Sequence, residues 1–281
     1  MTAQEPRYSD RFIDLPNFRV HYIEAGTGHP VVLLHGAGPG ATSSTNFSPS
    51  IGALAEHFRV IAPDMPGWGE SDTQNDDTGR DHTAVLIALL DALDIPRAAL
   101  VGNSMGGITA FSTSIAHPDR VSHLITMGTP APTVMSFSPG NGPTEGMAVL
   151  LHAYREPTAE NMKRLVQVMC FDQSMATDEL AQARAKAAEA RPDHLANWNS
   201  QFTGTPAPWP YLQLADKVRS ITAPTLVIHG RDDRVVPLEN SLHLVTRIPN
   251  SRAIVLNRCG HWAQIEHAAE FNQLVTSFIN G

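Results

Sequence analysis

The sequence predicts an α/β fold: a mostly parallel sheet flanked by helices and interrupted by an all-helical insertion. Two observations support this fold class. Short apolar runs alternate with amphipathic helical patterns through residues 18–128, and the strand pattern resumes at Thr225. Between these parts the alternation stops, and the chain carries helical patterns without strands. We therefore expect a core made of residues 1–132 and 210–281, with a helical lid subdomain at 133–209.

Seven segments have the pattern of strands. Residues 18–24 alternate in period two, which is typical of an antiparallel strand. The other six are compact apolar runs, as expected for parallel strands that are buried on both faces. These six runs cover residues 31–35, 59–63, 99–103, 123–128, 225–230 and 252–256.

Helical stripes separate these strands and fill the insertion. In the core, leucines at positions 86, 89, 90 and 93 lie on one helix face, and a similar stripe runs through residues 271–278. The insertion has four helical patterns, at 144–154, 159–169, 178–190 and 193–202, each starting near a Thr, Asp or Pro. Open α/β sheets bind ligands beyond the carboxyl ends of their strands, so we expect the insertion to cover that edge.

Composition excludes several classes of function. The 281 residues have a formal net charge of −8, so we expect neither nucleic-acid nor membrane-surface binding. The N-terminal stretch lacks a signal-peptide pattern, and no apolar run approaches the ~18 residues of a membrane span. Cys170 and Cys259 lack metal-ligand spacing and make no disulfide framework, which favours reduced thiols in the cytoplasm. We expect no metal and no cofactor.

A candidate nucleophile lies between a strand pattern and a helix pattern. Residues 99–102 lead into Asn103-Ser104-Met105-Gly106-Gly107, followed by a helical stretch. Small residues two before and two after Ser104 allow a sharp strand-to-helix turn that exposes its hydroxyl. The Met105 N–H, at the start of the helix, would then face a substrate oxygen. An ordinary glycine-rich turn is the simpler alternative for this motif.

A serine nucleophile needs a general base and a group that orients the base. His261 follows the last predicted strand of the core and precedes its last helix. Asp232 and Asp233 follow the strand at 225–230, so both lie on the same sheet edge as Ser104. We prefer Asp233 as the acid because the first Asp of such a pair more often caps the loop backbone. Both aspartates could instead be simple turn residues.

The second donor to a substrate oxyanion is expected after an early strand. The run at 31–35 leads into Gly36-Ala37-Gly38-Pro39-Gly40, where backbone N–H groups can approach a ligand closely. The Ala37 N–H is our candidate. A phosphate-binding loop is disfavoured because no Gly-Lys-Ser/Thr follows.

Together these motifs resemble the α/β-hydrolase superfamily, whose fold implies an eight-stranded, mostly parallel sheet. The resembling segments include His35-Gly36, Asp64-x-x-Gly67-x-Gly69-x-Ser71, the Ser104 turn, Asp233 and Gly260-His261. The serine argues against haloalkane dehalogenases and epoxide hydrolases of this fold, which use an aspartate nucleophile.

A narrower resemblance is to the meta-cleavage product hydrolases, which cleave carbon–carbon bonds in bacterial degradation of aromatic and steroid rings. It spans residues 35 to 264. The motifs that carry it are 36–41 with Asn46, 102–107, 230–237, Asp172-Gln-Ser with Arg184, and 259–264. Asn103 before the serine and Trp262 after the histidine are the most specific. Ala37 departs from the family, where many members have Gly, which affects local loop shape more than chemistry.

The resemblance implies an anionic substrate, a 2-hydroxy-6-oxohexa-2,4-dienoate. Water would cleave its C5–C6 bond to 2-hydroxypenta-2,4-dienoate and a carboxylic acid. It further implies that Arg184 binds the substrate carboxylate, helped by polar groups of Gly38, Asn46, Asn103 and Trp262. From residue type alone, a solvated residue on a helix face is the favoured interpretation of Arg184. The resemblance also implies a homodimer or a larger homo-oligomer.

Apolar residues are expected to surround the substituent on C6. The candidates are Leu165 and Met169 in the lid and Val235 and Val236 in the core, although ordinary lid packing explains them equally well. Two other functions remain open from the residues. One is a carboxylesterase or lactonase with the same Ser-Asp-His triad. The other is a small-molecule receptor with slow turnover on the same fold.

Overall fold

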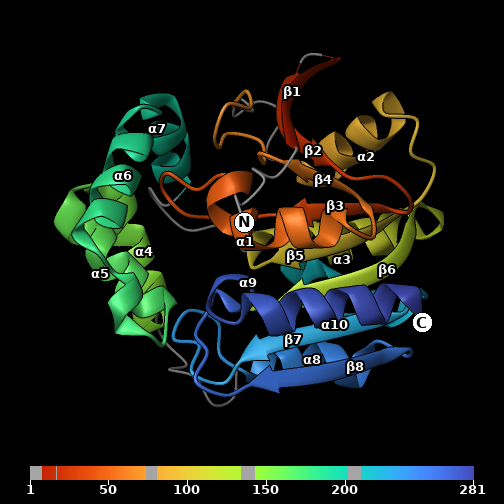
Figure 1. Cartoon of the computed structure of the whole chain (residues 1–281). Helices are drawn as coiled ribbons and strands as arrows, with labels where there is room; N and C mark the ends of the chain where they lie inside the picture. Colours follow the sequence, from red (N-terminus) through yellow and green to blue (C-terminus); the bar gives the residue numbers. More distant parts are fainter. Residues whose placement is uncertain (1–7, 17, 74–80, 134–142, 202–209) are drawn as a thin grey trace, which may run out of the picture.

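The chain folds around one eight-stranded sheet, with strand order β1-β2-β4-β3-β5-β6-β7-β8. This computed structural model describes residues 8–16, 18–73, 81–133, 143–201 and 210–281 (Figure 1). β2 is antiparallel to β1 and β4, and every other neighbouring pair is parallel. The predicted mostly parallel α/β-hydrolase sheet is thus confirmed. The strands are β1 (Tyr8–Leu15), β2 (Phe18–Ala25), β3 (Pro30–Leu34), β4 (Arg59–Pro63), β5 (Ala98–Asn103), β6 (Val121–Met127), β7 (Thr225–Gly230) and β8 (Ser251–Leu256).

In the described part of the chain, six α-helices flank the sheet and four follow one another between β6 and β7. The flanking helices are α1 (Ser43–Ala55), α2 (His82–Ala92), α3 (Met105–Ala116), α8 (Glu239–Arg247), α9 (Ala263–Glu266) and α10 (Ala268–Asn280). The four between β6 and β7 are α4 (Glu145–Arg155), α5 (Ala159–Met169), α6 (Asp178–Glu189) and α7 (Pro192–Ser200). Short 3₁₀ turns are η1 (Pro118–Arg120), η2 (Gln173–Met175), η3 (Pro210–Leu214) and η4 (Val218–Ser220).

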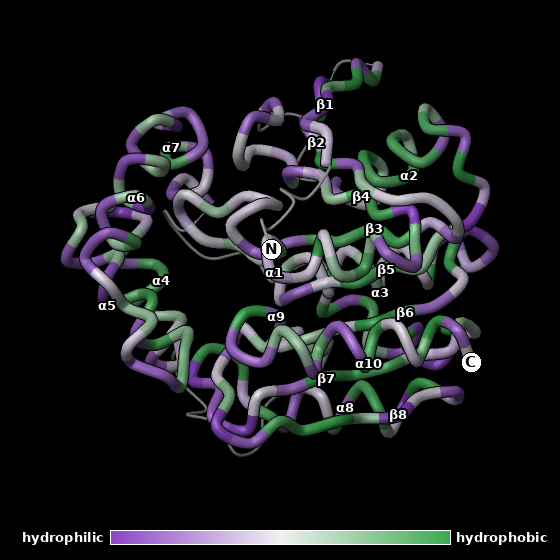
Figure 2. The backbone as a smooth tube through the Cα atoms, viewed as in Figure 1, coloured by the Kyte–Doolittle hydropathy of each residue, from purple (hydrophilic) through white to green (hydrophobic). Residues whose placement is uncertain are grey.

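Each face of the sheet is covered by its own hydrophobic layer. On one face, α1 and α10 pack Phe47 and Phe271 against Val31 and Val101. On the other face, α2, α3 and α8 pack leucine and phenylalanine side chains against the alternate residues of the same strands. Because β3, β5 and β7 are buried almost along their whole length, most of their side chains are apolar on both faces, as predicted. Figure 2 shows the hydrophobic residues concentrated in these central strands.

The two outer strands differ from the sequence predictions. β1 was not predicted: it mixes polar and apolar side chains without a regular period, and all its residues except Ile13 and Leu15 are exposed. The prediction that 252–256 is buried on both faces was wrong. β8 is an edge strand that pairs only with β7, and Val255 is 44% exposed. An edge strand has one neighbour and less cover, so apolar content alone does not reveal its exposure.

Helices α4–α7 form a group beyond the carboxyl ends of the parallel strands (Figure 1). Threonine side chains cap three of them, because the hydroxyls of Thr144, Thr158 and Thr177 accept backbone N–H groups of the first turn. Their inward faces join the same hydrophobic cluster as α2 and α3. No helix in the described residues has the length and apolar character that crossing a membrane requires.

Candidate active site

Ser104 occupies the sharp turn between β5 and α3. Its backbone is in the left-handed region, with φ 52° and ψ −113°, which is strained for a residue other than glycine. The turn is possible because the residues two before and two after Ser104 are glycines. A Cβ on Gly102 would lie 2.3 Å from the Gly106 carbonyl oxygen, and one on Gly106 would lie 2.0 Å from the Leu34 oxygen. The Ser104 N–H donates to Met127 O at 2.9 Å, which anchors the turn to β6.

Asp233 and His261 meet at the same edge of the sheet. Asp233 Oδ2 accepts a hydrogen bond from His261 Nδ1 at 2.8 Å, and both side chains are buried. Asp233 Oδ1 accepts the N–H groups of Val235 and Val236 at 2.8 and 2.9 Å. Burial alone would raise the pKa of Asp233, but His261 and these hydrogen bonds outweigh burial and lower it. Asp233 is therefore an ionised partner that holds the His261 ring.

The other candidate acid points elsewhere. Asp232 lies one residue earlier and pairs with Arg231 at 3.3 Å. Its N–H donates to Cys259 O, so it braces the turn after β7 against the loop before His261. Of the two aspartates, only Asp233 contacts the candidate base.

Asn103 links the turn at Ser104 to the loop that carries His261. Its Nδ2 donates to the carbonyl oxygens of Met127 and His261, each at 3.2 Å. Its Oδ1 is buried and has no hydrogen-bond partner among the described residues. The side chain thus holds the Ser104 turn beside the backbone of the candidate base.

The predicted oxyanion loop packs directly against Ser104. A Cβ on Gly36 would lie 2.6 Å from Asn103 Oδ1 and 3.3 Å from Ser104 Cβ. Neither the Ala37 N–H nor the Met105 N–H donates to another residue within the described ranges. Met105 begins α3, where the first N–H groups have no partner inside the helix. Both donors could therefore serve a substrate oxygen.

His35 fixes the direction of the Ala37 N–H. His35 Nε2 accepts the Met65 N–H at 2.8 Å, so Nδ1 carries the proton and donates to Gly36 O at 2.9 Å. Burial lowers the pKa of His35, which keeps the ring neutral. The Gly36 carbonyl and the Ala37 N–H share one planar trans peptide and point in opposite directions, so holding the carbonyl aims the donor.

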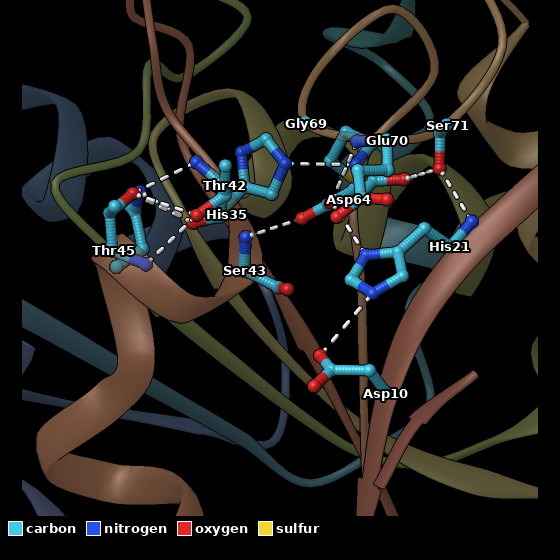
Figure 3. A network of polar contacts seen from close by, with 12 residues as sticks. Asp10, His21, His35, Thr42, Ser43, Thr45, Asp64, Gly69, Glu70 and Ser71 are labelled. Carbon is cyan, nitrogen blue, oxygen red and sulfur yellow. Dashed lines mark hydrogen bonds and ion pairs between the residues drawn. The ribbon is translucent and has the colours of Figure 1, made fainter. Parts of the chain in front are cut away.

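A buried carboxylate secures the same loop at its other end (Figure 3). Asp64 Oδ1 accepts the Ser43 N–H at 2.7 Å, where the loop enters α1. Asp64 Oδ2 accepts His21 Nδ1 at 2.7 Å and the Glu70 N–H at 3.1 Å. Burial would raise the pKa of Asp64, but the His21 hydrogen bond, His35 and the backbone donors lower it. The Asp64 hydrogen bond raises the pKa of His21.

We expect Asp64→Asn to reduce the free energy of unfolding by about 3 kcal/mol, because one buried partner of a charged pair is neutralised. An amide also has only one acceptor oxygen for three donors. Asp10→Asn is the matched control: this 66%-exposed carboxylate lies 3.4 Å from the other nitrogen of His21, and its loss should cost under about 1 kcal/mol.

Chemical denaturation at several pH values tests this prediction. The lowered Asp64 pKa stabilises the fold above the unfolded value of about 4, and this contribution is lost as pH falls through the folded pKa. The raised His21 pKa stabilises the fold below about 6.5, and this contribution is lost as pH rises through the folded pKa. The deficit of Asp64→Asn should therefore be largest between these values. Equal deficits for both variants would contradict the assignment.

Arg184 of α6 reaches from the helices between β6 and β7 to the loop at residues 36–40. Its side chain is buried, and its Nη2 donates to Pro39 O at 3.3 Å. The guanidinium lies 5.2 Å from the Trp262 ring centroid, and a Cβ on Gly38 would lie 3.3 Å from Nη2. Burial lowers the pKa of Arg184 to about 10, which leaves it protonated at neutral pH.

No carboxylate within the described residues pairs with this buried cation. Arg184 Nε is buried and has no hydrogen-bond partner there. A buried charge without a counter-ion is costly, so an anionic ligand would stabilise this guanidinium. Among the described residues, no group of three or more His, Cys, Asp and Glu side chains has a metal-binding arrangement.

The remaining predicted residues divide into two groups. Leu165, Met169, Val235 and Val236 are buried and belong, with Trp262, to one hydrophobic cluster. Asn46 is buried inside α1, where its Nδ2 donates to Thr42 O at 3.1 Å. Whether any of these residues touches substrate stays a prediction.

Sequence reasoning missed three residues at this site. Tyr154 of α4 accepts the Gly38 N–H at 3.1 Å and so joins α4 to the loop at residues 36–40. Buried His229 lies 3.6 Å from Asp233 Oδ2. Glu266 binds backbone N–H groups on both sides of the lid–core boundary. Tyr154 lies in an apolar helical pattern and His229 in a strand, and neither context signals a polar role.

Comparison with known proteins places the chain in a family. The model of the alpha/beta hydrolase fold family matches residues 29–268. A 2-hydroxy-6-oxononadienedioate/2-hydroxy-6-oxononatrienedioate hydrolase of Burkholderia vietnamiensis is 43% identical, over 97% of this chain and 95% of that protein. A 2-hydroxy-6-oxo-6-phenylhexa-2,4-dienoate hydrolase of Comamonas testosteroni is 41% identical, over 95% and 93% of the two chains. The solved meta-cleavage product hydrolase of Pseudomonas fluorescens IP01 is 35% identical, with a TM-score of 0.83 over 96% and 97% of the chains.

A strained serine at a strand–helix turn, joined through Asn103 to the backbone of a buried Asp–His pair, is the arrangement of a serine hydrolase of the α/β-hydrolase fold. The chain belongs to this fold family and, within it, to the meta-cleavage product hydrolases. It is an enzyme of the class that hydrolyses carbon–carbon bonds.

Proposed function

We propose that this enzyme hydrolyses the C5–C6 bond of a 2-hydroxy-6-oxohexa-2,4-dienoate-type ring-fission product. The products are 2-hydroxypenta-2,4-dienoate and a carboxylic acid. One observation carries the proposal: Arg184 is a buried, protonated guanidinium without a carboxylate partner in the described residues. A planar guanidinium binds a carboxylate with two parallel hydrogen bonds. A simple esterase has no need of such a cation beside its oxyanion loop.

The substrate would lie between Arg184 and Ser104. The carboxylate pairs with Arg184, and this contact orients the dienoate chain toward the nucleophile turn. The substituent on C6 then faces the apolar cluster of Leu165, Met169, Val235 and Val236. Burying such a substituent contributes about 25 cal/mol for each Å² of apolar surface removed from water.

Carbon is a poor leaving group, so the dienol must first become a ketone by protonation at C5. His261 moves this proton. The later departure of the C5 carbanion is then stabilised as an enolate of the 2-oxo acid. Asp233 keeps the His261 ring in the tautomer and orientation that proton transfer requires.

Ser104 Oγ then attacks C6, and its proton passes to His261. The oxyanion on the former ketone oxygen accepts the N–H groups of Ala37 and Met105. One such donor is worth about 3–4 kcal/mol of barrier. When the tetrahedral centre collapses, the C5–C6 bond breaks and C6 stays as an ester on Ser104. The protonated His261 gives its proton to the departing dienolate, which leaves as 2-hydroxypenta-2,4-dienoate, so the ring is again a neutral base. A water molecule, deprotonated by His261, hydrolyses that ester and releases the carboxylic acid.

We expect Arg184→Ala to reduce kcat/KM for a ring-fission dienoate about 100-fold, which corresponds to ~3 kcal/mol for a charged hydrogen-bonded pair. Turnover of p-nitrophenyl acetate, which has no carboxylate, should change less than about threefold. Lys186→Ala is the control, because Lys186 is an exposed cation on the same helix. Dienoate consumption is followed by loss of its yellow absorbance. Equal losses on both substrates would remove the proposed role of Arg184.

A further inference from the structure

A single carboxylate ties the lid to the loop that carries His261. Glu266, the last residue of α9, accepts the Gly260 N–H on Oε1 at 2.7 Å. Its Oε2 accepts the Phe171 and Asp172 N–H groups, at 2.6 and 3.1 Å. Gly260 directly precedes the candidate base, whereas Phe171 and Asp172 follow the end of α5. Three backbone donors from two distant segments thus converge on one side chain.

The end of α5 and the loop before His261 are also in direct backbone contact. The His261 N–H donates to Met169 O at 2.7 Å. A Cβ on Gly260 would lie 2.4 Å from Met169 O and 3.0 Å from the Cys170 Cα, so the backbones are in direct contact. The end of α5 therefore reaches the candidate base through its own carbonyl as well as through Glu266.

Charge explains why a carboxylate suits this place. All three groups that point at Glu266 are backbone donors, and the salt bridges between described residues include none made by Glu266. An ionised carboxylate has acceptor sites for all of them. A glutamine of the same shape would turn an NH₂ group toward at least one N–H donor, so one contact would become repulsive.

We propose that Glu266 is a positioning residue that makes the end of α5 and the His261 loop move as one body. This inference rests on the proposed role of His261 as the base. Asp233 sets the orientation of the His261 ring, while Glu266 and Met169 O set the place of its backbone. We call the contacts of Glu266 with Gly260, Phe171 and Asp172 the clamp. Leu165 and Met169 lie on α5, so the clamp also fixes the apolar side of the site relative to the base.

Glu266→Gln tests the clamp in the full-length protein. We expect kcat to fall about 100-fold, as a displacement near 1 Å of a catalytic group does, while KM changes less than about threefold because Arg184 is untouched. Glu266→Asp keeps the charge but is one methylene too short to reach both segments, so it should restore only part of the rate. Glu270→Gln is the control. This more exposed carboxylate on α10 pairs with His267 at 3.7 Å, and its loss should leave kcat unchanged.

The rate at which a fluorophosphonate probe labels Ser104 gives a readout that does not depend on the natural substrate. Labelling requires the Ser104–His261 pair, so it should slow in Glu266→Gln roughly as kcat does. If wild-type enzyme ignores dienoates but labelling still slows in the variant, the proposed function fails and the clamp stands. If Glu266→Gln is labelled as fast as the wild-type enzyme, the proposed positioning role of Glu266 is wrong.

Hydrogen exchange of the wild-type protein covers the case in which the variants do not fold. Because one side chain binds both segments, peptides spanning 170–173 and 259–262 should exchange at rates within about threefold of each other. Exchange of the lid segment tenfold or more faster than the His261 segment would contradict a shared clamp.

Discussion

Ser104→Ala should lower kcat for every carbonyl substrate by about 10⁶-fold, as expected when the nucleophile of a serine hydrolase is removed. In the proposed mechanism the Ser104 oxygen attacks C6, and no other group in the described site replaces it. The change removes one oxygen and keeps a Cβ at the strained turn, so the fold should be unaffected. Arg184 and the apolar cluster remain, so substrate binding should persist. The measurement pairs steady-state kinetics with a spectroscopic titration of the dienoate.

Ser112→Ala is the control for this variant. Ser112 lies on α3, about two helical turns after Ser104. Its substitution should leave kcat within about twofold because it is remote from the site. Residual activity of Ser104→Ala above about one per cent would mean that another group attacks the substrate. Loss of dienoate binding together with turnover would instead indicate a collapsed site.

Asp233→Asn should lower kcat about 10⁴-fold, the size of effect expected when the tautomer of the base is reversed. The amide oxygen can still accept the Val235 and Val236 N–H groups, so the loop should stay folded. The amide nitrogen then faces His261 Nδ1 and donates to it. The ring proton must move to Nε2, and the nitrogen that should accept the serine proton is blocked.

Asp232→Asn separates this effect from a general change of charge. Asp232 is the neighbouring residue of the same loop, carries the same charge and pairs with Arg231. Its substitution should alter kcat by less than about threefold, because Asp232 does not contact His261 and a partly exposed ion pair contributes little. A larger loss in Asp232→Asn than in Asp233→Asn would mean that the acid has been assigned to the wrong aspartate.

Much of the fold was predictable from local patterns. Residues buried on both faces must be apolar, so β3, β5 and β7 were visible as short apolar runs. Threonine caps and amphipathic spacing predicted the four helices between β6 and β7. β1 and the exposure of β8 were not predictable, because an edge strand is defined by which neighbours are absent.

The candidate site was predictable for residues that follow the ends of strands. Ser104, Asp233 and His261 each lie just after a strand, and parallel strands bring their carboxyl ends to one edge. Roles that depend on contacts between distant segments were invisible. Nothing local distinguishes Glu266 from a surface glutamate, and the burial of Arg184 depends on the packing of α6 against the oxyanion loop.

The most direct test of the central claim is the stoichiometry of wild-type turnover on 2-hydroxy-6-oxo-6-phenylhexa-2,4-dienoate and 2-hydroxy-6-oxononadienedioate. The yellow absorbance is followed, and the products are quantified by chromatography. With at least one of these substrates, we expect repeated turnover at about 1 s⁻¹ or faster, with one 2-hydroxypenta-2,4-dienoate and one carboxylic acid formed per molecule consumed. Rapid p-nitrophenyl ester hydrolysis without cleavage of either dienoate would contradict the claim and identify an esterase.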